Sequence, residues 1–179
     1  DIVYVSGTVY SVVLTPEQQK APGVEVLIPT YGVDRVPDKT VRIETDNFRF
    51  DIPLRALNTF EYQKYKADSD CYVRLTLFPA APGRLEAASA NSGKQAVTGF
   101  EVGAAVQQAH RSDAMSYFNQ DLHVFWPHKG QILPQIMTRD AISGKWTAAN
   151  SALDLSTGWY NVGVRKPEQF AFFVPRRMR

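Results

Sequence analysis

Three histidines are the first residues to consider for chemistry, because imidazole is the commonest side-chain ligand of transition metals. They are His110, His123 and His128, and the last two enclose the segment HVFWPH. Residues five apart on a strand face opposite sides, so His123 and His128 would converge only through a turn at Pro127. A catalytic zinc site usually needs three converging ligands. We therefore expect no metal ion and no cofactor.

The other reactive groups favour structural roles. Cys71 begins the apolar stretch CYVRLTLF, where a free cysteine usually behaves as a small buried hydrophobe. Asp68 and Asp70 flank a serine, but calcium usually takes six or more oxygens, so we expect a solvated turn there. The chain contains no glycine-rich phosphate loop, no Gly-x-Ser-x-Gly motif and no His-Glu-x-x-His motif. We accordingly predict no catalytic residue and a non-enzymatic protein.

Aromatic and basic residues of the last third are the candidates for binding. Exposed tryptophans could stack on a sugar or anchor an interface, although we expect at least two of the three to pack in the core. The basic end of the chain would suit an acidic partner. The candidate interface or ligand-binding residues are Trp126, Trp146, Trp159, Tyr160, Arg176, Arg177 and Arg179.

The composition indicates one domain without a nucleic-acid or membrane signal. A chain of 179 residues, 44% of them hydrophobic, can bury a full core, so we expect a single domain over residues 1–179 with a loop insertion at 79–96. Its net charge of +2 is too small to indicate a nucleic-acid surface. No apolar run approaches the ~20 residues of a membrane helix. A single cysteine excludes an intrachain disulfide.

Alternating hydrophobic residues predict the strands that would carry these side chains. Residues 41–54, VRIETDNFRFDIPL, indicate two strands joined by a turn at Asp46-Asn47. On the second strand we expect the apolar residues to be buried and the charged ones to face outward, because a slip of one residue would reverse the two faces. The expected core residues are Phe48, Phe50 and Ile52, and the expected outward residues are Arg49 and Asp51.

Further strands are expected across the rest of the chain, at 2–14, 24–28, 72–78, 97–106, 122–126, 132–138, 145–148, 159–164 and 170–174. Helices are expected to be few: a short one within 54–66, a single turn at 15–17 and a weak helical stripe over 104–118. The segment Pro79–Ala96, rich in Pro, Gly, Ser and Ala, predicts a long surface loop. The predicted fold is all-β, an antiparallel β-sandwich with a long loop and one or two short helices.

Three motifs in the first third resemble the carboxypeptidase regulatory-like, or transthyretin-like, β-sandwich family. They are VSGTVY at 5–10, APGVEVLIP at 21–29 and ETDNFRFDIP at 44–53. The resemblance implies a transthyretin-like (prealbumin-like) sandwich. Asn47 stands where the family has a glycine, and asparagine can adopt the same left-handed conformation. Intradiol dioxygenases use a similar sandwich, but the chain lacks their Arg-Pro-x-His-x-His cluster, so the fold implies no enzymatic activity.

These observations predict a structural or binding module of an extracytoplasmic (periplasmic or secreted) or virion-type protein assembly. The partners would be other protein subunits, in contact with the terminal strands or the 79–96 loop, because apolar edge strands need cover. A start at Asp1 without a signal peptide fits a processed export product or a shortened chain. Two alternatives stay open: a carbohydrate-binding module using the late aromatics, and a metal-dependent enzyme on a transthyretin-like scaffold.

Overall fold

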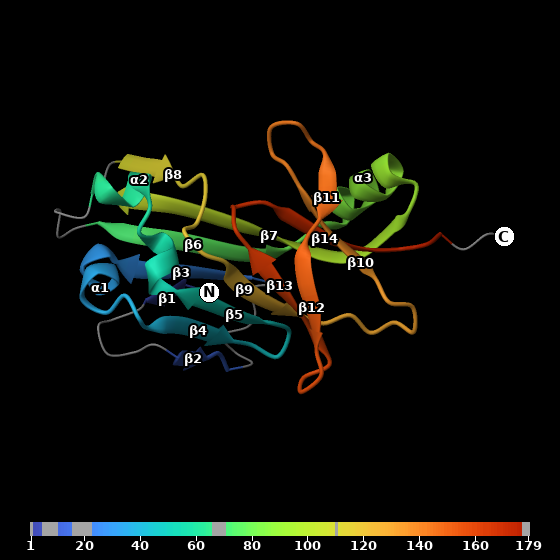
Figure 1. The fold of residues 1–179 in the computed structure, drawn as a ribbon, viewed down its shortest axis with the longest axis horizontal. Coiled ribbons are helices and arrows are strands. Elements are labelled where there is room, and N and C mark those ends of the chain that lie inside the picture. Colours follow the sequence, from blue (N-terminus) through green and yellow to red (C-terminus); the bar gives the residue numbers. More distant parts are fainter. Residues whose placement is uncertain (1, 5–10, 16–22, 66–70, 110, 177–179) are drawn as a thin grey trace.

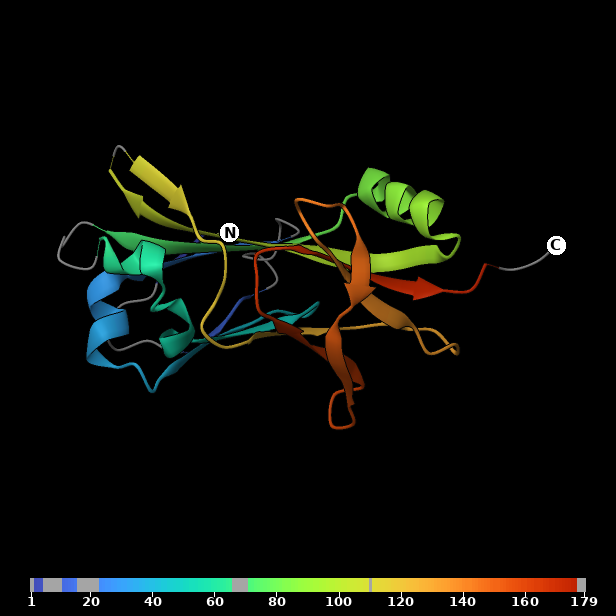
Figure 2. The same ribbon diagram turned by 45° about the horizontal axis from the view of Figure 1, so that its top comes forward.

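The computed structural model describes residues 2–4, 11–15, 23–65, 71–109 and 111–176. They form two β-sheets that lie face to face, as Figures 1 and 2 show from two directions. The first sheet contains, in spatial order, β1 (Ile2–Tyr4), β3 (Val24–Pro29), β6 (Tyr72–Pro79), β7 (Gln95–Gln108), β14 (Gln169–Val174), β10 (Gln135–Arg139) and β11 (Trp146–Ala148), with β8 (Arg111–Ala114) beside β7. The second contains β12 (Asn150–Asp154), β13 (Trp159–Val164), β9 (Leu122–Trp126), β5 (Arg49–Pro53), β4 (Thr40–Glu44) and β2 (Ser11–Val13).

This arrangement confirms the predicted all-β sandwich. Most strand pairs are antiparallel, but β1 runs parallel to β3 and β2 runs parallel to β4. Those two parallel pairs were not expected from the sequence. β1 and β2 lie in different sheets, each at an outer edge.

The core lies between the two sheets and contains the apolar residues that the alternation predicted. Phe48, Phe50 and Ile52 are at most 3% exposed, which confirms their predicted burial. Trp126 stacks on Phe48 with ring centroids 5.7 Å apart and lies 5.0 Å from the ring of Phe100. Facing side chains from both sheets thus interdigitate, as a sandwich requires.

The predicted hairpin of β4 and β5 is confirmed, but its turn forms in an unexpected way. Every described residue with a positive φ is a glycine, so Asn47 does not adopt the left-handed conformation. Instead, Thr45 closes the turn: its Oγ1 accepts hydrogen bonds from the N–H groups of Asn47 and Phe48, each at 3.0 Å. Its own N–H donates to the Phe48 carbonyl at 2.9 Å. The hydroxyl of Thr45 therefore stabilises the turn without a residue in the left-handed conformation.

Asp51 points away from the core, as predicted, but it is not open to solvent. It is only 7% exposed, because Arg42 and Arg49 cover it. Arg42 Nε lies 3.0 Å from one carboxylate oxygen, and Arg49 donates to the other at 2.8 Å. The hydrogen bond to Asp51 raises the pKa of Arg49, whose guanidinium also lies 4.1 Å from the ring centroid of Phe125. The outer face of the second sheet is thus covered by an ordered ionic cluster.

Two segments form elements other than those predicted. Residues 79–96 are not a long loop, because they contain helix α3 (Pro82–Ser92) and the start of β7. Pro82 occupies the first helical turn, and Gly93, with a φ of 70°, ends the helix in the left-handed region. The weak helical stripe over 104–118 is also wrong, since this segment ends β7 and forms β8.

The remaining helices are short and lie together at one end of the molecule (Figure 1). The helix predicted within 54–66 is confirmed as a 3-10 turn, η2 (Leu54–Leu57), followed by α2 (Phe60–Gln63). Helix α1 (Thr30–Arg35) was not predicted. The helical turn proposed at 15–17 lies mostly outside the described residues. In the described part of the chain, no helix has the length and apolar character needed to cross a membrane.

The strand β11 continues through Ala149 into β12 and thereby passes from one sheet to the other. β11 pairs with β10 of the first sheet, and β12 pairs with β13 of the second. In Figures 1 and 2, this continuous strand crosses the others steeply, with β10 on one side and β13 on the other. Residues 146–154 therefore close one side of the sandwich, and the candidate site lies there.

Candidate functional site

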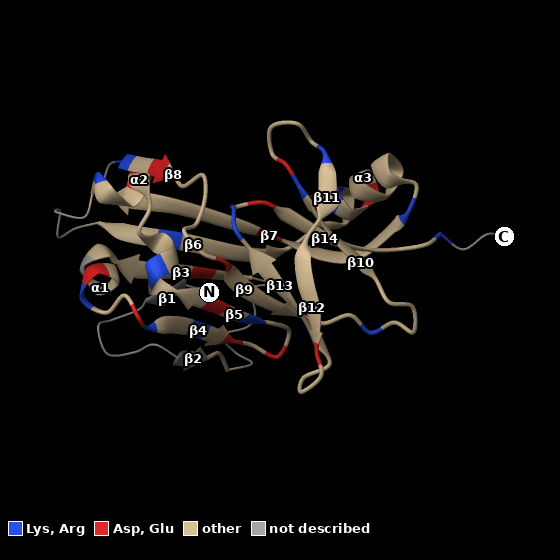
Figure 3. Ribbon diagram, in the orientation of Figure 1, with Lys and Arg blue, Asp and Glu red and all other residues tan. Residues whose placement is uncertain are grey.

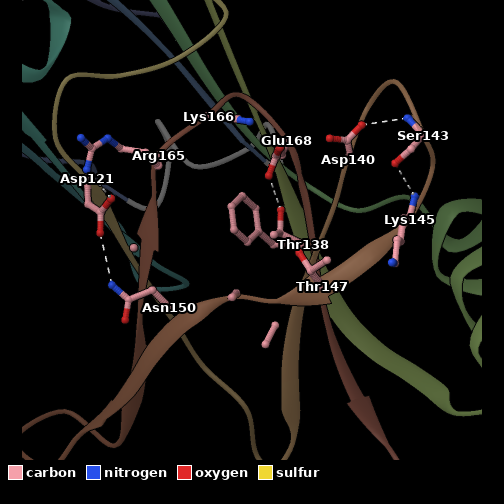
Figure 4. A pocket seen from close by; sticks show the side chains of 14 residues that line it. Asp121, Thr138, Asp140, Ser143, Lys145, Thr147, Asn150, Arg165, Lys166 and Glu168 are labelled. Carbon is pink, nitrogen blue, oxygen red and sulfur yellow. Dashed lines mark hydrogen bonds and ion pairs between the residues drawn. The ribbon is translucent and has the colours of Figure 1, made fainter.

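A polar cleft of about 390 Å³ lies where the crossing strand leaves the first sheet. Its walls come from β10, from residues 147–150 of the crossing strand, from the end of β13 and from the β13–β14 connection at 165–168. Figure 4 shows the polar side chains that surround the opening, and Phe170 of β14 is among the other lining residues. Residues from three stretches of the sequence, at 121, 138–150 and 163–170, thus meet at one place.

One wall of the cleft is held by Arg165. Its Nε donates to the carbonyl of Phe118 at 2.8 Å, and a second nitrogen donates to the carbonyl of Asn119 at 2.7 Å. A third nitrogen lies 3.7 Å from Asp121, whose other oxygen accepts from the Asn150 amide at 3.2 Å. These bonds tie the ends of β9, β12 and β13 together.

Gly163 makes the packing of this wall possible. A Cβ atom at this position would lie 2.6 Å from Asp121 Oδ2 and 3.1 Å from the amide nitrogen of Asn150. The absence of a side chain lets both polar groups lie flat against β13. The wall is therefore built from fixed groups that already have partners.

The carboxylates of the opposite wall also have partners. Asp140 accepts hydrogen bonds from the backbone N–H groups of Ser143 and Ile142, both at 2.8 Å. Glu168 accepts from the hydroxyl of Thr138 at 2.6 Å. Figure 4 shows Asp140 and Glu168 engaged in this way. Both acidic groups thus help to order the hairpin and the connection that bear them.

The two lysines of the cleft differ from its carboxylates. Lys145 stands at the start of β11 and Lys166 on the β13–β14 connection, and both line the opening. Within the described ranges, neither side-chain ammonium makes a hydrogen bond or an ion pair. The lining carries three acidic and three basic side chains in all, and the backbone N–H groups of Ser143 and Ile142, together with the charge of Lys166, lower the pKa of Asp140.

The titration of Asp140 tests the hairpin that forms one wall. The backbone N–H groups of Ser143 and Ile142 lower the pKa of Asp140 from its ordinary 3.8. The stabilisation they give is present above pH 3.8 and is lost as the pH falls through the lower folded value. We expect the Asp140 carboxyl signal in NMR to titrate below 3.8. The difference in free energy of unfolding between the wild type and Asp140→Asn should become smaller over the same pH range. A midpoint of the Asp140 titration at or above pH 3.8 would contradict the described hairpin.

A free strand edge lies next to the cleft. Among the described strands, β11 and β12 are the last of their sheets, so each has one side on which no described strand pairs with it. Ala149 donates to the carbonyl of Ile136, and the carbonyl of Lys145 accepts from Asp140. Because partners alternate along an antiparallel pair, the N–H and C=O groups of Ala148 point away from β10. Ala148 also lines the cleft, so the free edge and the cleft are continuous there.

The structure places the predicted tryptophans in three different environments. Trp126 is 5% exposed in the core and donates to Thr98 Oγ1 at 3.0 Å. Trp146 is half-buried and packs edge-on against Phe173, with ring centroids 5.4 Å apart, in a small cluster with α3. Trp159 is half-buried on β13. They do not form one stacking surface.

The other predicted binding residues lie elsewhere. Tyr160 packs edge-on against Phe172, with centroids 5.7 Å apart, on the inner side of β13. Arg176 donates to the carbonyl of Ser89 at 2.9 Å, which fixes the chain end against α3. Arg177 and Arg179 lie outside the described residues. None of the predicted binding residues that the structure describes lines the cleft.

The histidines lie apart. His123 hydrogen bonds with Asn161 Oδ1 at 2.9 Å, while His128 lies near the Ile132 carbonyl and lines a separate hollow of about 840 Å³. His110, Asp68 and Asp70 are outside the described residues. Among the described residues, no group of three or more His, Cys, Asp or Glu is placed to hold a metal ion. Cys71 is fully buried, as the sequence predicted.

Comparison with known proteins adds no family. No protein-family model matches the chain, and no curated sequence or solved structure matches it significantly. The geometry of the cleft and of the strand edge beside it is therefore the basis for a functional proposal.

Proposed function

We propose that this chain is a non-enzymatic binding module of a protein assembly, and that it takes an extended segment of a partner protein on the free edge of β11. The observation that carries the proposal is the unprotected edge formed by β11 and β12. Residues 146–153 contain no charged residue and no proline. Asp154, at the end of β12, is the only charged residue of the two strands. Figure 3 shows charge only near its two ends.

Such an edge is unusual, because unpaired strand edges normally carry features that prevent pairing. The edge strand β8 shows the usual protection: Arg111 and Asp113 lie on it, 4.0 Å apart at their charged groups. The β11 edge lacks such charges. An extended peptide can therefore add to it through main-chain hydrogen bonds, which is a common mode of protein recognition.

Exposed apolar side chains flank the same stretch. Ile142, at the turn before β11, is 99% exposed, and Leu155, just after β12, is 89% exposed. Leu153 on β12 is 43% exposed. These side chains offer apolar area next to the unpaired backbone groups, which supports docking of a protein segment rather than of a small polar solute.

Ala148→Pro tests the proposal without breaking the internal ladder. Proline removes an N–H that points away from β10, and edge strands tolerate proline at such positions. The probe is a blocked pentapeptide of alternating threonine and valine with a central glutamate. We expect it to protect the Ala148 amide of the wild type from hydrogen exchange, and we expect the variant to bind at least tenfold more weakly.

Ala149→Pro is the matched control, since it removes the N–H that bonds to Ile136. It should lower stability, whereas Ala148→Pro should keep the wild-type melting temperature within a few degrees. Equal binding by the wild type and Ala148→Pro would refute strand addition at β11. A dimer that forms on concentration, and that Ala148→Pro abolishes, would replace the partner segment by a second copy of the chain.

The proposal includes the finer points that the sequence suggested. The three motifs at 5–10, 21–29 and 44–53 support a transthyretin-like subtype of the sandwich. The assembly we propose is extracytoplasmic or virion-type. The predicted contacts need revision in one respect: β14 is paired on both sides, by β7 and β10, so the C-terminal strand offers no free edge.

A further inference from the structure

We infer that the partner segment is acidic, and that one of its carboxylates enters the cleft between Lys145 and Lys166. The inference rests on the proposed function, since it names the chemistry of the segment that pairs with β11. It assigns a role to the cleft that strand pairing alone leaves unexplained.

The charged side chains of the cleft differ in the hydrogen bonds that they already make. Each carboxylate of the cleft already accepts from a neighbour: Asp121 from Asn150, Asp140 from two backbone N–H groups, and Glu168 from Thr138. The two lysine ammonium groups donate to no described residue. The two charged groups of the cleft that make no hydrogen bond to a described residue are therefore cationic donors, and the group complementary to them is an anion.

The cleft and the edge strand β11 lie next to each other. The cleft adjoins β11, and Ala148, whose own backbone groups point away from β10, is one of its lining residues. A segment that pairs with β11 would run along the opening, and its alternate side chains would point to the two faces of the sheet. In Figure 4, Lys166 lies at the top of this opening and Lys145 at its right, with Glu168 and Asp140 between them. A carboxylate carried by the segment could reach both.

The size and the lining of the cleft limit what else it could hold. A cavity of about 390 Å³ is within the range of small-molecule sites, but those are lined mainly by apolar groups. This one is lined by six charged side chains beside Phe170 and two alanines. It is thus better suited to one charged side chain that arrives on a docked strand than to a separate apolar ligand.

Three blocked pentapeptides, identical except for a central glutamate, glutamine or lysine, test the inference. Titration of each into the full chain, followed by NMR of the Lys145 and Ala148 amides, gives three affinities. We expect the glutamate peptide to bind about fivefold more tightly than the glutamine peptide, because two exposed ion pairs contribute modestly in water. The lysine peptide should bind most weakly. The preference should shrink when salt is raised to 1 M.

The double variant Lys145→Gln/Lys166→Gln should bind the glutamate and glutamine peptides equally. Lys64→Gln is the matched control, because Lys64 lies beside Phe60 at the far end of the molecule, and it should keep the preference. If all three peptides bind the wild type equally, the acidic partner is refuted while strand pairing stands. If none protects the Ala148 amide, the proposed function itself fails.

Discussion

Replacement of Phe50 by alanine is expected to lower the free energy of unfolding by about 3 to 5 kcal/mol. The side chain is fully buried, and its strand neighbours Ile43 and Val124 are fully buried too. Truncation would leave a cavity at the centre of the sandwich that two hydrogen-bonded sheets cannot close by shifting. Denaturant titration would show a lower midpoint with an unchanged slope.

Phe60→Ala is the matched control for this prediction. Phe60 is 66% exposed on α2, and its ring lies under the ammonium of Lys64 at 4.8 Å. The same truncation there should change stability by about 0.5 kcal/mol or less. If Phe50→Ala lowers the free energy of unfolding by less than about 1 kcal/mol, this face of β5 is not buried. That result would contradict the described packing of the two sheets.

The strands were predictable because their signal is local. Alternation in residues 41–54 indicates both the hairpin and its buried face, and the same pattern places Trp126 with Leu122 and Val124 on the inner side of β9. Adjacent residues on a strand face opposite sides, which explains why Trp159 and Tyr160 do not act together. In these cases sequence spacing alone carries the structural information.

Helix α3 was missed for a different reason. Alanine, glycine, serine and proline in residues 79–96 suggested a loop, yet the order of these residues matters more than their proportion. Pro82 stands in the first turn and Gly93 follows the last, an order typical of a capped helix. Only Ala88 within α3 is buried, so the helix has almost no apolar stripe for periodicity to detect.

The cleft could not be predicted from any local pattern. Its residues come from 121, 138–150 and 163–170, and they meet only because β10 pairs with β14 and β13 pairs with β9. The passage of the strand between sheets at Ala149 is likewise a tertiary effect. The sequence did contain one usable signal: residues 146–153, between the turns DAISG and DLSTG, carry no charge.

The second large effect is expected for Gly99→Ala on β7. A Cβ atom there would lie 2.2 Å from the carbonyl oxygen of Phe170 and 3.1 Å from the Cα of Ala171, which is far closer than van der Waals contact. Both obstacles belong to the backbone of β14, so the two strands would have to separate. We expect a loss of about 3 kcal/mol, at the upper end of the usual cost of overpacking.

Gly103→Ala on the same strand separates this effect from the loss of a glycine as such. Its Cβ would meet Thr76 Oγ1 at 2.5 Å, but this oxygen belongs to a side chain that can rotate. Alanine also favours the extended strand more than glycine does, so the net change should stay within about 1 kcal/mol. Because Phe170 lines the cleft, Gly99→Ala should shift the amide signals of residues 165–170 in NMR, whereas Gly103→Ala should leave them in place. Equal effects of the two substitutions on stability and on these signals would show that β7 and β14 are not held as closely as described, and the wall of the cleft would then lack its rigid support.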